Sequence, residues 1–166
     1  PMMTKPMLLY WDSCAFIHRF QETPQYVEPL REHIEQAKIG NCRIATSAIT
    51  LAEVYKLPDM GILPVEVSNK ILEFFRNDYI VVYQADRPVC EEAHHIQRLH
   101  SGLLPADAIH VATALSAKAN VLITSDTKKY RRNGLLAHNL RIGNPPIKIE
   151  IPNAAMFHPL PGVGGG

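Results

Sequence analysis

The sequence is poor in cysteine and has no long apolar run. Its three cysteines, Cys14, Cys42 and Cys90, are far apart and lack the Cys-x-x-Cys spacing of a zinc or redox site. We interpret them as reduced packing residues of a cytoplasmic protein. No stretch approaches the roughly 20 consecutive apolar residues that a membrane helix needs, and the short run near residue 8 does not match a secretory signal. We therefore expect a soluble protein without a membrane span.

An excess of charge of one sign is also missing. The 17 Lys and Arg residues nearly balance the 16 Asp and Glu residues, so the formal net charge is only +1. Any binding of nucleic acid must then come from a local basic patch. The chain shows no internal repeat and no break in composition, and 46% of its 166 residues are apolar. We predict a single domain over residues 1–166.

Short apolar runs alternate with helical patterns along the chain. The runs suit strands buried on both faces, and they are MLLYW (7–11), CRIAT (42–46), YIVVY (79–83) and VLIT (121–124). The helical patterns cover residues 26–38, 47–56, 65–77, 89–100 and 106–118. This alternation predicts an α/β fold of three layers, with helices on both faces of a central, mainly parallel sheet.

The last part of the chain has a different pattern. IKIEI (147–151) alternates apolar and charged residues, which is typical of a half-exposed edge strand. The segment GNPP (143–146) and the tail from Pro152 onward are rich in turn-forming residues, and we expect them to be loosely held.

Four acids stand where ligands of a parallel sheet bind. Asp12 and Asp126 follow apolar runs, and Glu53 and Asp107 lie in the helical patterns. Each has a purely structural alternative. Asp12 and Asp126 are good N-caps for the helices that follow them, and Asp107 complements a helix dipole. Thr50 and Glu53 match a capping box, although in the middle of a helical pattern.

Capping does not explain why all four acids lie among apolar residues. If the carboxylates converge, each pair about 5 Å apart repels by roughly 3 kcal/mol at an effective dielectric of about 20. A cluster of this kind requires a cation. Carboxylate oxygens without a set of His or Cys ligands favour Mg²⁺ or Mn²⁺ over zinc.

Four segments carry a resemblance to a known family. They are YWDSCAFI, TSAITLAEVYK, PADAIHVATAL and LITSDTKKY, in this order. Together they resemble the PIN domain, especially the VapC-like ribonuclease toxins of toxin–antitoxin pairs, over about residues 7–135. The resemblance implies a Rossmann-like α/β/α fold and a Mg²⁺- or Mn²⁺-dependent endoribonuclease that hydrolyses single-stranded RNA. Its acidic site corresponds here to Asp12, Glu53, Asp107 and Asp126, accompanied by the hydroxyl residues Ser13 and Thr124.

Within this resemblance we assign Asp12 and Asp107 as the principal metal ligands, with Glu53 and Asp126 completing the site. The chain departs from many relatives at Lys128, where they carry a further acid. It also has a C-terminal extension, residues 143–166, that a compact toxin does not need. The family further implies a homodimer and an antitoxin of the VapB type as partner.

A basic run follows the last acid. Lys128, Lys129, Arg131 and Arg132 lie close to Asp126 in sequence and are candidates for holding RNA phosphates. A solvated helix face explains them equally well. His110 lies one helical turn after Asp107, and we interpret it as a packing histidine near the rim of the site.

Three other functions remain open from the residues. A haloacid-dehalogenase-type phosphohydrolase also places an acid after its first strand, but it needs Asp-x-Asp, and the third residue here is Cys14. A PIN nuclease that processes RNA without being a toxin would carry the same four acids. A PIN fold that has lost catalysis would serve as a binding module, and the presence of all four acids argues against it.

Overall fold

The computed structural model describes residues 5–126 and 134–158. Within these ranges a five-stranded sheet has the order β5-β2-β1-β6-β7. Every neighbouring pair in it is parallel. The strands are β1 (Met7–Trp11), β2 (Cys42–Ser47), β5 (Ile80–Tyr83), β6 (Val121–Ile123) and β7 (Ile149–Glu150). The prediction of a central parallel sheet is confirmed.

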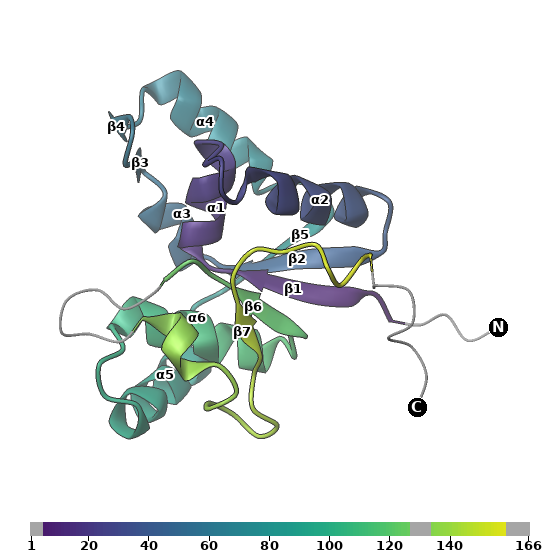
Figure 1. The fold of residues 1–166 in the computed structure, drawn as a ribbon. Helices are drawn as coiled ribbons and strands as arrows, with labels where there is room; N and C mark the ends of the chain where they lie inside the picture. Colours follow the sequence, from purple (N-terminus) through teal and green to yellow (C-terminus); the bar gives the residue numbers. More distant parts are fainter. Residues whose placement is uncertain (1–4, 127–133, 159–166) are drawn as a thin grey trace.

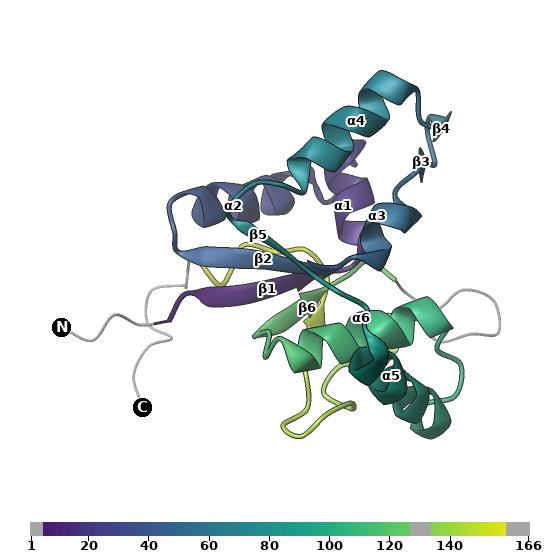
Figure 2. The same cartoon turned by 180° about the vertical axis from the view of Figure 1, so that it is seen from behind.

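Helices cover both faces of this sheet, so the domain has three layers (Figures 1 and 2). One side carries α1 (Ser13–Phe20), α2 (Val27–Lys38), α3 (Ile49–Glu53) and α4 (Val65–Phe74). The other side carries α5 (Arg87–Leu99) and α6 (Pro105–Ser116). In the described part of the chain, none of the helices is long and apolar enough to cross a bilayer. The α/β/α class expected from the alternating pattern is confirmed.

Strand β1 supplies side chains to two separate cores. Leu9 and Trp11 belong to the core under α1, α2 and α4, whereas Tyr10 belongs to the core under α5 and α6. This follows from the period of two in a strand, which sends successive side chains to opposite faces. All three side chains are fully buried. Because both faces of β1 are covered, its sequence is apolar throughout.

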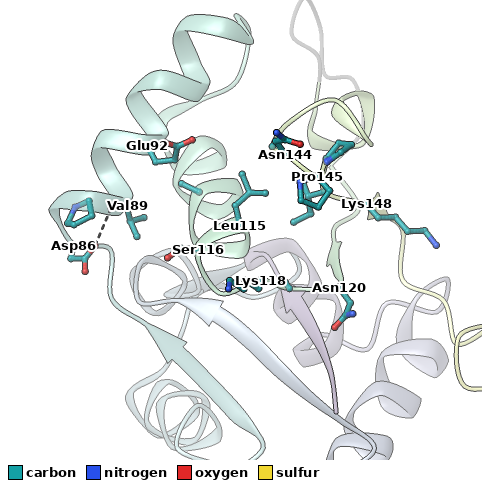
Figure 3. Close-up of a pocket in the computed structure, with 16 residues that line it drawn as sticks. Asp86, Val89, Glu92, Leu115, Ser116, Lys118, Asn120, Asn144, Pro145 and Lys148 are labelled. Carbon is teal, nitrogen blue, oxygen red and sulfur yellow. Dashed lines mark hydrogen bonds between the residues drawn. The ribbon is translucent and has the colours of Figure 1, made fainter. Parts of the chain in front are cut away.

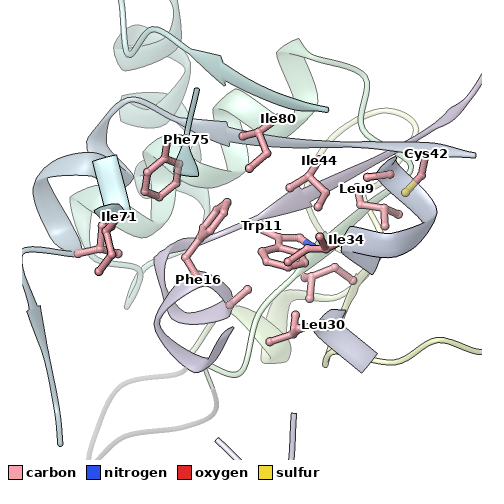
Figure 4. Close-up of a cluster of buried hydrophobic side chains, with 14 of the residues drawn as sticks. Leu9, Trp11, Phe16, Leu30, Ile34, Cys42, Ile44, Ile71, Phe75 and Ile80 are labelled. Atoms are coloured by element: carbon pink, nitrogen blue, oxygen red, sulfur yellow. The ribbon is translucent and has the colours of Figure 1, made fainter. Parts of the chain in front are cut away.

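Aromatic contacts join α1 to the sheet and to α4 in the first core (Figure 4). The Phe16 ring centroid lies 4.9 Å from that of Trp11 and 4.8 Å from that of Phe75, the C-cap residue that follows α4. Burial of one such side chain contributes about 1.5–3 kcal/mol to stability. These contacts hold the first turn of α1 against the end of β1, which is where the first acid of the candidate site lies.

The helix predicted over residues 47–56 is much shorter in the structure. Helix α3 ends at Glu53, and the chain then forms a hairpin of β3 (Lys56–Leu57) and β4 (Gly61–Ile62). Gly61 adopts a positive φ of 73°, a conformation that glycine tolerates and most residues do not. The apolar spacing of this segment therefore comes from a short helix followed by a turn.

The C-terminal extension is not loosely held over its described residues. The Asn153 carbonyl oxygen accepts a hydrogen bond from Nε2 of His33 at 2.6 Å, and Met156 and Phe157 pack against the first core. The expectation of a loose tail is therefore wrong up to residue 158, because its two apolar side chains find a place beside α2. Strand β7 is an edge strand as predicted, although it covers only two residues of IKIEI.

Candidate active site

The two strand-end acids, Asp12 and Asp126, are joined by one hydroxyl group at the carboxyl edge of the sheet. Strands β1 and β6 are parallel neighbours, with Trp11 paired to Ile123. The hydroxyl of Thr124 donates to Oδ2 of Asp12 and accepts the backbone N–H of Asp126 at 3.0 Å. One fully buried side chain thus holds both strand-end acids in a common arrangement.

Asp12 is the buried acid of the site. It is only 2% exposed, and it is the N-cap of α1, since its Oδ1 accepts the N–H of Ala15 at 3.1 Å. The pKa of Asp12 is raised to about 6, chiefly by burial and to a smaller extent by the charge of Asp107. The electrostatic influence of His110 and the hydrogen bonds from Thr124 and Ala15 act in the opposite direction on this pKa. The capping interpretation is correct for Asp12, yet it leaves a carboxylate that is costly to ionise.

The two helix-borne acids come from opposite faces of the sheet. Asp107 lies in the first turn of α6, as predicted, and Glu53 is the last residue of α3. Glu53 takes no part in a capping box, because Ala48 is the N-cap of α3 and no side chain caps it. Its carboxylate instead accepts a hydrogen bond from Nε2 of His110 at 2.8 Å. The capping-box alternative is therefore wrong.

Cys14 shows that all four acids share one neighbourhood. This residue lies in the first turn of α1 and is half-buried. The negative charges of four acids raise the pKa of its thiol well above the usual range, with Asp12 as the largest cause and burial as the second. The other three contributing acids are Asp126, Asp107 and Glu53. Four carboxylates from four separate elements thus act on one thiol.

Asp126 also shapes the chain that follows. Its Oδ2 accepts the N–H of Leu135 at 3.1 Å, and its carbonyl oxygen accepts the N–H of Leu136 at 3.1 Å. These residues begin the 3-10 helix η1 (Leu135–His138). The helix that we expect Asp126 to cap falls in residues 127–133, outside the described residues, and the described helix that Asp126 contacts starts nine residues later. The basic run that follows in the sequence, Lys128, Lys129, Arg131 and Arg132, lies outside the described residues.

Two histidines near the acids were not identified as site residues from the sequence. His110 is 1% exposed and bridges Glu53 and Tyr10, so it is buried as expected but is bonded to a site acid. His18 contacts Oγ of Ser125 at 2.7 Å and so connects α1 to the residue before Asp126. The signal in the sequence for His110 was its helical spacing of three residues from Asp107.

Ser13, the hydroxyl residue expected beside the first acid, is the half-buried first residue of α1.

Hydrogen bonds to protein groups already engage the carboxylates of Asp12, Glu53 and Asp126. Over residues 5–126 and 134–158, no three or more His, Cys, Asp and Glu side chains are grouped so that they could hold a metal ion. Asp12 uses one lone pair on each oxygen for Thr124 and Ala15, and Glu53 is turned to His110. The donor set nevertheless suits a hard cation, because it consists of carboxylates. The charges of all four raise the pKa of the Cys14 thiol, and the charge of Asp107 adds to the effect of burial on the pKa of Asp12.

A large pocket lies elsewhere, between α5, α6 and residues 143–148 (Figure 3). Its volume is about 840 Å³, and none of the four acids lines it. Gly143 borders it with a φ of 97°, and a Cβ at this position would meet Cδ2 of Leu115 at 2.5 Å. Its charged walls mix Lys118 and Lys148 with Asp86 and Glu92. The pocket is therefore lined by charges of both signs, whereas acids alone gather at the carboxyl edge of the sheet.

The raised pKa of Asp12 predicts how stability depends on pH in metal-free protein. The folded state binds this proton more tightly than the unfolded chain, so the free energy of unfolding falls as pH rises from 3.8 through about 6. The full difference is roughly 3 kcal/mol. We expect Asp12→Asn to remove this slope and to stabilise the protein at pH 7.5. Urea unfolding in the presence of chelator between pH 4 and 8 measures this dependence. Asp86→Asn, at an exposed helix cap, is the control. An unchanged pH slope for Asp12→Asn would contradict the assignment.

Comparison with known proteins identifies the fold and the family. No curated protein matches the chain. A VapBC2 structure from Rickettsia felis, bound to a DNA fragment from its promoter, matches with a TM-score of 0.58 and 18% identity, covering 87% of this chain and 98% of that chain. Mycobacterium tuberculosis VapC20, a toxin that cleaves the sarcin-ricin loop, matches with a TM-score of 0.53 and 12% identity, covering 69% and 86%. A toxin–antitoxin complex from Klebsiella pneumoniae gives 0.53 and 20%, covering 74% and 90%. Residues 9–135 match the PIN domain, and the chain belongs to this family.

Proposed function

We propose that the protein is a metal-dependent endoribonuclease that hydrolyses phosphodiester bonds of single-stranded RNA. The observation that carries this proposal is the set of four acids, from four separate elements, whose charges all act on the Cys14 thiol at the carboxyl edge of a PIN fold. Three of them also contact residues of neighbouring elements: Asp12 with Thr124, Asp126 with Leu135 and Glu53 with His110. The phosphohydrolase alternative is set aside because the chain belongs to the PIN family.

Asp12 and Asp107 are the proposed principal ligands of Mg²⁺ or Mn²⁺, with Glu53 and Asp126 completing the set. When bound, such an ion lowers the pKa of a coordinated water and polarises the phosphodiester. Thr124 and the N–H of Ala15 hold the two oxygens of Asp12 in place, so that one lone pair on each oxygen is left for a ligand. Burial of Asp12 keeps solvent from competing at this carboxylate.

Replacement of the principal acids is expected to stop cleavage. Asp12→Asn and Asp107→Asn keep the shape of each side chain but remove its charge. We expect the rate of RNA cleavage to fall by more than about 100-fold, because losing a residue that only orients a metal ligand already costs up to roughly that much. Cleavage of a labelled single-stranded RNA in Mn²⁺, with and without chelator, measures this.

Asp86→Asn is the matched control, since Asp86 caps α5 and lies apart from the four acids. Undiminished cleavage by both site variants would reject the acidic site. Chelator-resistant cleavage would reject the metal, and hydrolysis of a small phosphate ester without RNA cleavage would point to another phosphohydrolase. If the wild-type protein shows neither activity, the chain is a binding module of the PIN fold.

The basic run after Asp126 is the proposed contact for RNA phosphates. Each phosphate contact to single-stranded RNA contributes about 0.7 to the slope of log affinity against log salt concentration. We expect neutralisation of Lys128, Lys129, Arg131 and Arg132 to reduce that slope by up to about 3. Binding of RNA to the cleavage-deficient Asp107→Asn background, titrated with salt, gives the slope. An unchanged slope would mean that the run is a solvated face.

We further propose that the nuclease is the toxin of a toxin–antitoxin pair and acts in the cytoplasm, with a VapB-like antitoxin and a second copy of the chain as partners. Solved toxin–antitoxin complexes with the same fold support the role. We expect induced expression to arrest bacterial growth, and Asp107→Asn to abolish the arrest at equal protein level. Growth curves with immunoblotting test this. Cleavage in vitro without growth arrest would indicate an RNA-processing nuclease.

A further inference from the structure

A chain of three hydrogen-bonded side chains runs from the second core to the acidic site. It starts at Tyr10 of β1, passes through His110 of α6 and ends at Glu53 of α3. The Tyr10 hydroxyl lies 2.7 Å from Nδ1 of His110, and Nε2 of His110 lies 2.8 Å from Oε1 of Glu53. Tyr10 is fully buried and His110 is 1% exposed, so water does not compete for the histidine.

The partners determine which ring nitrogen carries the proton. An ionised carboxylate only accepts hydrogen bonds, so Nε2 of His110 must donate to Glu53. In a neutral ring Nδ1 is then the acceptor, and the Tyr10 hydroxyl must donate to it. Burial raises the pKa of Tyr10 well above its usual value, which keeps that proton on the phenol. All three groups are matched without a conflict between donors or acceptors.

His33 shows what a purely structural buried histidine looks like in the same molecule. It is also fully buried and also bridges two groups, accepting from Nε1 of Trp11 at 3.2 Å and donating to the Asn153 carbonyl at 2.6 Å. Both of its partners are core or backbone groups. His110 differs because its outer partner is a site acid.

Glu53 needs such a partner more than the other acids do. It is the last residue of a five-residue helix, and its side chain is 32% exposed. No other hydrogen bond to its carboxylate occurs among the residues that the structure describes, whereas both Asp12 oxygens are held by neighbours. A carboxylate on a short helix end that lacks a second contact has several rotamers open to it, and the Nε2–H of His110 selects one.

We propose that His110 is a positioning residue of the nuclease: the Tyr10 hydroxyl fixes its ring, and its Nε2–H holds the Glu53 carboxylate in one rotamer at the edge of the acidic site. This inference rests on the proposed metal-dependent activity and adds to it a residue that contacts neither RNA nor metal. An outer partner that orients a carboxylate typically changes metal affinity or activity by about 10–100-fold.

Three variants test the proposal in the full-length protein. His110→Leu removes both hydrogen bonds, His110→Gln retains an N–H donor near the Nε2 position, and His33→Leu removes an equally buried histidine from the other core. We expect His110→Leu to weaken Mn²⁺ binding, measured by calorimetry without RNA, and to raise the half-saturating Mn²⁺ concentration for cleavage, each by about 10-fold or more. His110→Gln should recover most of the loss, and His33→Leu should lower only the urea midpoint.

A metal-free measurement examines the contact itself. In protein labelled with ¹⁵N-histidine, we expect the His110 ring to give a slowly exchanging, downfield Nε2–H signal that moves upfield in Glu53→Ala and not in Asp86→Ala. A ring protonated only on Nδ1, or a signal indifferent to Glu53→Ala, would overturn the inference.

The outcomes also separate this inference from the proposed function. If the wild-type protein binds Mn²⁺ and cleaves RNA while His110→Leu and His33→Leu have equal metal requirements, His110 is only a packing residue. If His110→Gln is as impaired as His110→Leu, the loss is one of packing and not of a donor, and the inference is again wrong. If the wild-type protein neither binds Mn²⁺ nor cleaves, the proposed function itself fails, and the positioning role fails with it.

Discussion

The buried carboxyl group of Asp12 is the constraint on which the site depends. It lies at the carboxyl edge of the sheet and is only 2% exposed, so desolvation opposes its ionisation. Thr124 from the adjacent strand and the N–H of Ala15 from the following helix offset part of that cost. Because these two partners belong to different elements, the first acid is stable only when β1, β6 and α1 are all in place. The acidic site and the fold are thus one arrangement.

The sheet order explains how acids far apart in sequence come together. Strands β1 and β6 are neighbours, so their carboxyl ends bring Asp12 and Asp126 to one edge. Helix α6 packs beneath the sheet and brings Asp107 from one side, and α3 brings Glu53 after β2. Parallel topology therefore gathers four segments separated by tens of residues without any local motif that encodes the cluster.

Much of the fold followed from the sequence, and the reasons for the failures are physical. Apolar runs such as MLLYW identify strands well because both faces of the sheet are covered. The segment after Ser47 was read as one long helix, since the apolar spacing continues past the point where α3 ends at Glu53. The packing of Phe157 depends on a tertiary contact with α2 that no local pattern reveals. Asp12 and Asp126 stand out in the sequence because they follow apolar runs, whereas Glu53 and Asp107 lie in helical patterns and join them through the family resemblance. The partner of Glu53 required coordinates, because a spacing of three residues between Asp107 and His110 says nothing about what lies across from the histidine.

The protonated thiol of Cys14 has a consequence for the chemistry of the protein. Thiolates, and not thiols, react with peroxide and with alkylating reagents, so a half-buried cysteine whose pKa is raised by four carboxylates reacts slowly with both. The electronegative surroundings that suit a cation therefore also shield the only cysteine in the first turn of α1 from oxidative damage. Neutralising those carboxylates would weaken that protection and leave only the part that burial provides, so the sensitivity of Cys14 to oxidants is tied to the charge of the site around it.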